Sequence, residues 1–113
     1  HRVAPDITYG REFWQILDAA GTDIVLNGHD HDYERFRTQD VDGAVNSEGI
    51  REFVSGAGGY SLRPELEPYA TGSEKRIDNQ FGYLVLELFP GRYTWQFKNV
   101  EGTVLDSGSD VCR

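Results

Sequence analysis

The sequence predicts an α+β domain in which one helix is followed by mostly antiparallel strands and a C-terminal β-meander. Apolar residues recur at helical spacing near the N-terminus, over residues 10–20. A short apolar run at residues 24–26 has the length of a strand. From residue 81 onward, strand-like segments alternate with tight turns, which is typical of a meander. With 113 residues, we expect residues 1–113 to form a single domain or part of a larger one.

The first third of the chain is expected to hold a loop, a helix and a strand. Residues 1–9 include a proline and should form the loop. Residues 10–20 predict the helix, because apolar side chains repeat every three or four positions and Gly21 is a natural stop. Trp14 is expected to lie in the core. Residues 23–26 follow through a very short link, and their consecutive apolar residues favour a strand covered on both faces.

The middle of the chain alternates between extended and turn-rich segments. Residues 36–40 are expected to form an extended arm, and the polar residues 42–49 form a loop. Residues 50–55 predict a strand that ends in the glycine-rich segment 56–59. No Gly-Lys-Ser/Thr follows these glycines, so we interpret them as a tight turn that lets a neighbouring segment pack closely. Residues 60–80 are expected to be a long irregular loop, a type of segment that is often functional.

Three strands and two turns are expected at the C-terminal end. Residues 81–88, 92–98 and 103–106 form the predicted strands. Aromatic residues occupy alternate positions in the second of these, so we expect them to form one face of the core. Residues 107–110 are expected to be a loose tail. The single cysteine, Cys112, has no partner in the chain and is expected to be a free thiol unless a further segment supplies one.

Composition excludes some classes of function. The 19 acidic and 11 basic residues give a net charge of −8, which argues against binding to a nucleic-acid backbone or to an anionic membrane surface. No apolar segment is long enough to span a membrane. The sequence contains no methionine, so we expect the chain to be processed or to be a fragment.

Two histidines one residue apart follow the apolar strand, and they are the candidate metal ligands. In an extended segment, residues i and i+2 point the same way, so His29 and His31 could hold one metal ion or a close pair. Asp30 and Asp32 could add oxygen ligands or fix the histidine tautomers. Ligand sites in α/β sheets lie beyond the carboxyl ends of strands, which is where these residues are expected.

The sequence around these histidines resembles a known family. The matching residues are Gly28-His29-Asp30-His31-Asp32-Tyr33-Glu34-Arg35. This octet is similar to the last metal-ligand block of the calcineurin-like metallophosphoesterases, in the Gly-His-x-His-x-Tyr-Glu-Arg form of purple acid phosphatases and related secreted bacterial phosphoesterases. The glycine-rich turn and the Asp-Ser-Gly segment before the terminal cysteine extend the resemblance. It implies the C-terminal half of an αββα sandwich, and an extracellular or periplasmic protein.

The resemblance also implies a dinuclear metal centre and a reaction. His29 would bind one metal ion and His31 the other, the ions being Fe, Zn or Mn. Four other residues of the block would position and support the ligands: Asp30, Tyr33, Glu34 and Arg35. The implied reaction is metal-assisted hydrolysis of a phosphate ester. The other ligand blocks of the family are absent from this chain, so the resemblance implies that catalysis needs a missing N-terminal half.

Two partner predictions follow from these expectations. The loop at residues 60–80 offers Arg63, Lys75 and Arg76 as possible contacts to a substrate phosphate. A separated fragment would expose sheet surface that the missing half normally covers, so self-association is also expected.

Two alternative functions remain open from the residues alone. A cupin also uses His-x-His followed by a glutamate, but Glu34 follows His31 by one position fewer than the cupin spacing, and no later block supplies a third histidine. A non-catalytic β-rich accessory or interaction module is the second alternative, in which the histidines bind no metal.

Overall fold

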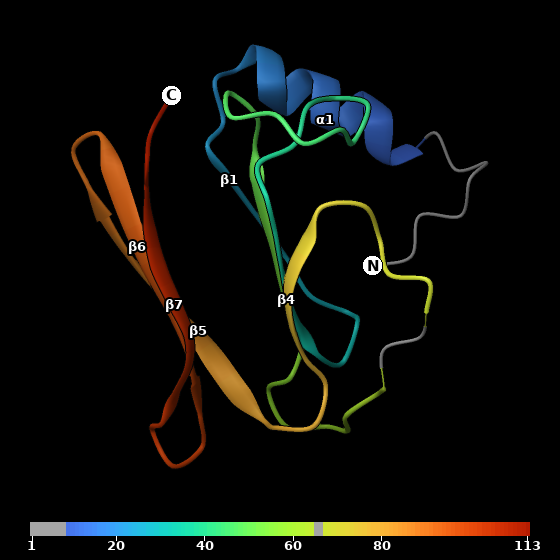
Figure 1. Cartoon of the computed structure of the whole chain (residues 1–113), viewed down its shortest axis with the longest axis vertical. Coiled ribbons are helices and arrows are strands. Elements are labelled where there is room, and N and C mark those ends of the chain that lie inside the picture. Colours follow the sequence, from blue (N-terminus) through green and yellow to red (C-terminus); the bar gives the residue numbers. More distant parts are fainter. Residues whose placement is uncertain (1–8, 65–66) are drawn as a thin grey trace.

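A computed structural model describes residues 9–64 and 67–113, and its two β-sheets lie face to face as two layers (Figure 1). The elements in chain order are α1 (Tyr9–Ala19), β1 (Ile24–Asn27), β2 (Tyr33–Phe36), β3 (Arg51–Ser55), β4 (Ser73–Ile77), β5 (Gly82–Phe89), β6 (Arg92–Asn99) and β7 (Val104–Val111). This confirms the predicted α+β class with one helix and a C-terminal meander. Apart from Tyr9, the loop expected at residues 1–9 lies outside the described residues.

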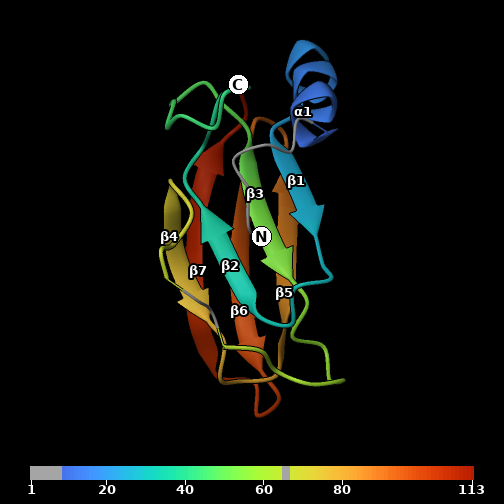
Figure 2. The same cartoon turned by 90° about the vertical axis from the view of Figure 1, so that its right-hand side faces the viewer.

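The first sheet has the strand order β1-β3-β2-β4 (Figure 2). Strands β1 and β3 run parallel, and β2 is antiparallel to both β3 and β4. The carboxyl ends of β1 and β3 and the start of β2 therefore lie at the same end of this sheet. The loop between β1 and β2 and the segment that follows β3 both emerge there.

The second sheet is the antiparallel meander β5-β6-β7, and its inner face supplies half of the buried core cluster. Tyr93, Trp95 and Phe97 of β6 are buried, which confirms the expected aromatic face. From the first sheet, Tyr33 stacks on Phe97 with ring centroids 4.1 Å apart, and Phe53 meets Trp95 edge-on at 5.6 Å. Aromatic contacts between the layers thus hold the two sheets together.

Helix α1 forms where it was expected but contributes little to the core. Gly21 ends it with a φ of +72°, a backbone conformation that glycine adopts without strain. Trp14 is only half-buried and lies outside the hydrophobic core, so its predicted core position is wrong. Its indole N–H donates to the Gln39 carbonyl at 3.5 Å. On the same helix, Phe13 is 71% exposed and Ile16 is 66% exposed.

The structure corrects three predicted segments. Strand β1 is not covered on both faces, because it lies at the edge of its sheet and Leu26 is 58% exposed. The segment 60–80 is not irregular throughout, since it contains β4, whose polar residues form a strand by pairing with β2. Residues 107–110 are not a loose tail, because β7 continues to Val111 alongside β6.

The polar composition of β7 has a physical explanation in its pairing with β6. Its alternate residues Asp106, Gly108 and Asp110 lie opposite Phe97, Trp95 and Tyr93 in the register, on the face toward the first sheet. A Cβ atom at Gly108 would lie 2.3 Å from the Trp95 ring, so only glycine leaves room for it. From Asp106 to Asp110, the inner face of β7 is therefore built from two charged residues and one glycine, and Leu105 is the residue of β7 that packs against the hydrophobic core.

Exposed apolar residues on α1 and β1 are where the self-association predicted from the sequence can be tested. Phe13, Ile16 and Leu26 are all more than half exposed, and β1 pairs only with β3 among the described strands. We expect a concentration-dependent dimer or larger species, measured by sedimentation velocity, and we expect Leu26→Lys to shift it toward monomer. A monodisperse monomer at high protein concentration would contradict this prediction.

No helix in the described part of the chain is long and apolar enough to cross a membrane.

Candidate functional site

Residues 28–32 form a bent loop between β1 and β2 that packs on the start of the glycine-rich segment after β3. The Gly56 N–H donates to the Asp32 carbonyl at 2.9 Å. A Cβ atom at Gly56 would lie 1.8 Å from the Asp30 carbonyl oxygen, so the loop packs where only glycine allows it. The expectation that these glycines permit close packing of a neighbouring segment is therefore confirmed for Gly56.

His29 has an unusual backbone conformation. Its φ is +75°, and it is the one non-glycine residue with positive φ among residues 9–64 and 67–113. The loop is therefore bent, and the assumption of an extended segment that would point both imidazoles the same way does not hold here. A left-handed residue other than glycine costs roughly 1–3 kcal/mol, and such strain concentrates at functional sites.

Replacing His29 by glycine is expected to raise the free energy of unfolding by roughly 0.5–1 kcal/mol. Glycine relieves the strain at positive φ, and its greater entropy in the unfolded chain offsets part of that gain. Urea unfolding measures the change. His31→Gly is the matched control, because His31 has no positive φ and should lose stability. A destabilised His29→Gly variant would show that the conformation carries no strain.

His31 is half-buried and is held by the segment that follows the glycine-rich turn. Its Nδ1 lies 2.8 Å from Ser61 Oγ. The Tyr60 ring meets the imidazole edge-on, with centroids 5.5 Å apart. The Arg63 N–H donates to the His31 carbonyl at 3.1 Å. Sequence reasoning missed Ser61, because a serine in an irregular segment carries no pattern that links it to a histidine thirty positions earlier.

Asp32 is buried beside the candidate ligands without a partner for one of its oxygens. The residue is 6% exposed, and its Oδ1 accepts no hydrogen bond within the described chain. Burial, with the neighbouring carboxylates of Asp30, Glu34 and Asp78, raises the pKa of Asp32 from 3.8 to about 6. An unpaired buried carboxylate is unfavourable when charged, and a cation nearby would stabilise it.

Asp32 makes a pH-dependent contribution to stability. Its folded pKa lies above its unfolded value, so the native state holds the proton more tightly, and the free energy of unfolding falls as pH rises from 3.8 to about 6. We expect Asp32→Asn to be roughly 1–3 kcal/mol more stable than the wild type at neutral pH, with the difference vanishing in acid. Chemical unfolding at both pH values measures this. Equal stability at neutral pH would mean that the carboxylate is solvated or paired.

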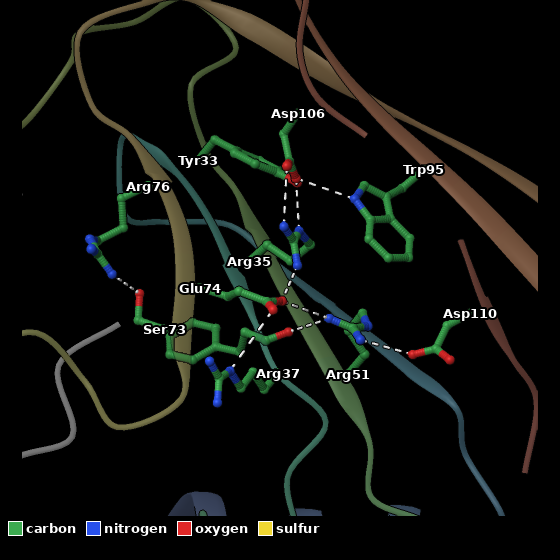
Figure 3. Close-up of polar contacts among 11 residues, drawn as sticks. Tyr33, Arg35, Arg37, Arg51, Ser73, Glu74, Arg76, Trp95, Asp106 and Asp110 are labelled. Carbon is green, nitrogen blue, oxygen red and sulfur yellow. Dashed lines mark hydrogen bonds and ion pairs between the residues drawn. The ribbon is translucent and has the colours of Figure 1, made fainter. Parts of the chain in front are cut away.

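Tyr33 and Arg35 point into the layer between the sheets, toward Asp106 of β7 (Figure 3). The Tyr33 hydroxyl and Arg35 Nε each donate to Asp106 Oδ2 at 2.8 Å, and Trp95 Nε1 donates to the same oxygen at 3.2 Å. Arg35 also pairs with Glu74 and lies over the Trp95 ring. These two residues of the octet therefore connect the strand after the histidine loop to the second sheet.

Glu34 belongs to the opposite face of β2 and is also buried, at 5% exposure. It accepts a hydrogen bond from the Ser73 hydroxyl. On the neighbouring strands, Asn27 donates its side-chain N–H to Glu52 Oε1 at 2.5 Å, and burial raises the pKa of Glu52 against the effect of that hydrogen bond. The outer face of the first sheet thus buries two carboxylates, Glu34 and Glu52, in addition to Asp32 in the loop.

The three cations proposed for substrate contact are placed differently by the structure. Arg63 is exposed and adjoins His31 through its backbone. Lys75 and Arg76 belong to β4, on the side of the first sheet away from β1. Arg76 donates to the Ser73 hydroxyl at 2.7 Å and lies 3.9 Å from the Tyr69 ring centroid. Arg63 is joined to the histidine loop by its backbone hydrogen bond to His31, and a role for any of the three cations stays a prediction.

The donor set of this loop fits part of a metal centre. Neutral imidazoles are good ligands for Zn and Fe, carboxylates suit Mn, and the buried Asp32 carboxylate, with its unpartnered Oδ1, follows His31 in the sequence. In the described residues, no three His, Cys, Asp or Glu side chains are grouped closely enough to hold a metal ion. His29 and His31 alone would therefore bind a metal ion weakly, and a complete centre would need further ligands from outside this part of the chain.

Comparisons with known proteins agree with this fold. No family model matches the sequence, and no curated protein is significantly similar to it. Among solved structures, the chain is similar to the purple acid phosphatase PPD1 isolated from yellow lupin (Lupinus luteus) seeds, with a TM-score of 0.77 and 23% sequence identity. The similarity covers 88% of this chain and 19% of that chain, so the chain spans about one-fifth of the phosphatase's length. The fold of this chain is that of a part of a purple acid phosphatase.

Proposed function

We propose that this chain is part of a metallophosphoesterase and carries two histidine ligands of its metal centre. The observation that carries the proposal is the position of His29 and His31. They lie in the loop beyond the carboxyl end of β1, within a fold similar to part of a purple acid phosphatase. The strained backbone of His29 and the unpartnered oxygen of Asp32 support a site that a cation completes.

The proposed activity is hydrolysis of a phosphate ester by the complete protein. Metal ions bound by these histidines and by ligands from outside this chain would neutralise negative charge on the phosphate and its leaving group. His29 and His31 would hold the ions, which we propose to be Fe, Zn or Mn. The strands β2 and β3 would position the loop, and Asp106 would anchor β2 through Tyr33 and Arg35.

The test is hydrolysis of a chromogenic phosphate monoester by the longest gene product that contains this chain. We expect His29→Ala and His31→Ala each to lower turnover by at least about 100-fold, because each removes a ligand. Ser47→Ala is the control, because Ser47 is exposed in the loop before β3. Undiminished turnover in both histidine variants would overturn the proposal.

The chain alone is expected to hydrolyse no ester, even with added Mn²⁺, Fe²⁺ or Zn²⁺, because two imidazoles do not complete a dinuclear centre. Robust turnover that depends on His29 would show that the chain is sufficient. If equilibrium dialysis finds no bound metal in the wild type or in His29→Ala, the accessory-module alternative is favoured instead.

A further inference from the structure

His31 is fixed in orientation, whereas the contacts around His29 leave its ring unconstrained. The His31 imidazole contacts the Ser61 hydroxyl and the Tyr60 ring. The backbone carbonyl of His31 accepts a hydrogen bond from the Arg63 N–H. Tyr60 is 89% exposed, so burial does not hold its side chain in place, and its ring packs against this imidazole. The side chain of His29 is exposed and makes no hydrogen bond to another described residue.

An imidazole must present a lone pair to bind a metal, and its second nitrogen decides which atom does so. The Nδ1 of His31 lies 2.8 Å from Ser61 Oγ, which leaves Nε2 without a hydrogen-bond partner among the described residues. When Nδ1 carries the proton and donates it to the hydroxyl oxygen, the lone pair resides on Nε2. Outer hydrogen bonds of this kind fix the tautomer and the ring orientation of metal-binding histidines.

We propose that Ser61 is a positioning residue for His31, accepting the Nδ1–H hydrogen bond and thereby presenting Nε2 to a metal ion. This inference rests on the proposed function and deepens it. It assigns different parts to the two histidines: His31 is oriented before metal binds, and His29 is oriented by the metal. The segment after β3 thus takes part in the site through Ser61, although it supplies no ligand itself.

The experiment measures the tautomer and the metal affinity of the same chain. Long-range ¹H–¹⁵N correlation spectra of the imidazoles, recorded without metal in mildly alkaline solution where imidazole is neutral, identify the protonated nitrogen. We expect His31 to carry its proton on Nδ1, and Ser61→Ala to shift the proton toward Nε2. Ser61→Thr keeps the hydroxyl and should restore Nδ1–H. The signals of His29 should not change in either variant.

Zinc titrations of these variants complete the test. We expect Ser61→Ala to bind Zn²⁺ about tenfold more weakly than the wild type, and Ser61→Thr and the control Ser47→Ala to bind as the wild type does. If zinc binds both rings but Ser61→Ala changes neither the tautomer nor the affinity, the role of Ser61 is overturned and the proposed function stands. If zinc shifts neither ring, the proposed function fails, and the role of Ser61 fails with it.

Discussion

Replacing Asp106 by alanine is expected to lower the free energy of unfolding by about 3–5 kcal/mol, the largest effect of any single substitution considered. The carboxylate accepts hydrogen bonds from Tyr33, Arg35 and Trp95, and the side chains of Arg35 and Asp106 are 11% and 8% exposed. Alanine leaves the guanidinium without this partner and the Tyr33 hydroxyl without its acceptor in a layer with little access to water. Urea unfolding of the two proteins measures the difference.

The pH dependence of this effect distinguishes a charge pair from a packing defect. Burial raises the pKa of Asp106, but the hydrogen bonds from Arg35 and Tyr33 outweigh it, and the pKa lies below its ordinary value. The stability that Asp106 contributes is therefore present above the unfolded pKa of about 4 and is lost as the pH falls through the folded pKa. The wild type and the alanine variant should approach each other in acid.

Asp42→Ala is the matched control for Asp106→Ala. Asp42 pairs with Arg11 at 2.6 Å, but these side chains are 64% and 51% exposed. A surface pair of this kind contributes little, so we expect a change of about 0.5 kcal/mol or less. Equal effects of the two substitutions would mean that the contacts of Asp106 between the sheets contribute no more than a surface pair.

Replacing Gly56 by alanine is expected to lower the free energy of unfolding by roughly 1–3 kcal/mol and to displace the histidine loop. The added Cβ would lie 1.8 Å from the Asp30 carbonyl oxygen and 2.8 Å from the Asp30 carbonyl carbon. Both are backbone atoms, so no side-chain rotation can relieve the contact, and the loop itself must move. Chemical unfolding measures the loss, and the NMR signals of His29 and His31 report the displacement.

Gly58→Ala is the control for this substitution. Gly58 lies two residues further along the same segment, has no positive φ, and nothing lies within 4 Å of an added Cβ atom. We expect its stability and its histidine signals to match the wild type. If Gly56→Ala behaves in the same way as Gly58→Ala, the loop does not depend on close packing at this position.

The parts of the fold that apolar periodicity encodes could be predicted from the sequence. Helix α1 follows from helical spacing, and β6 with its aromatic face follows from alternation. Strands β3, β5 and the start of β7 follow from short strand-like segments bounded by turns. Strand β4 and the end of β7 could not be predicted in this way, because their residues are polar. They form strands by pairing with β2 and β6 and, in β7, by charge pairs across the layer.

The candidate metal ligands come from the sequence, whereas the residues that contact them come from the structure. The His-x-His spacing after a strand identifies His29 and His31, and the octet identifies Tyr33 and Arg35 as residues with a supporting role to test. Their partner Asp106 lies more than seventy positions away, at the end of the predicted strand 103–106. Contacts of this separation depend on the pairing of the two sheets, which no local pattern in the sequence specifies.

Equilibrium dialysis of Zn²⁺ against this chain tests most directly whether the two histidines are metal ligands. We expect the wild type to bind zinc above background, and the double variant His29→Ala/His31→Ala to bind none while keeping its fold, as monitored by circular dichroism. Zinc binding that is equal in the wild type and in a folded double variant, or absent from both, would contradict the account.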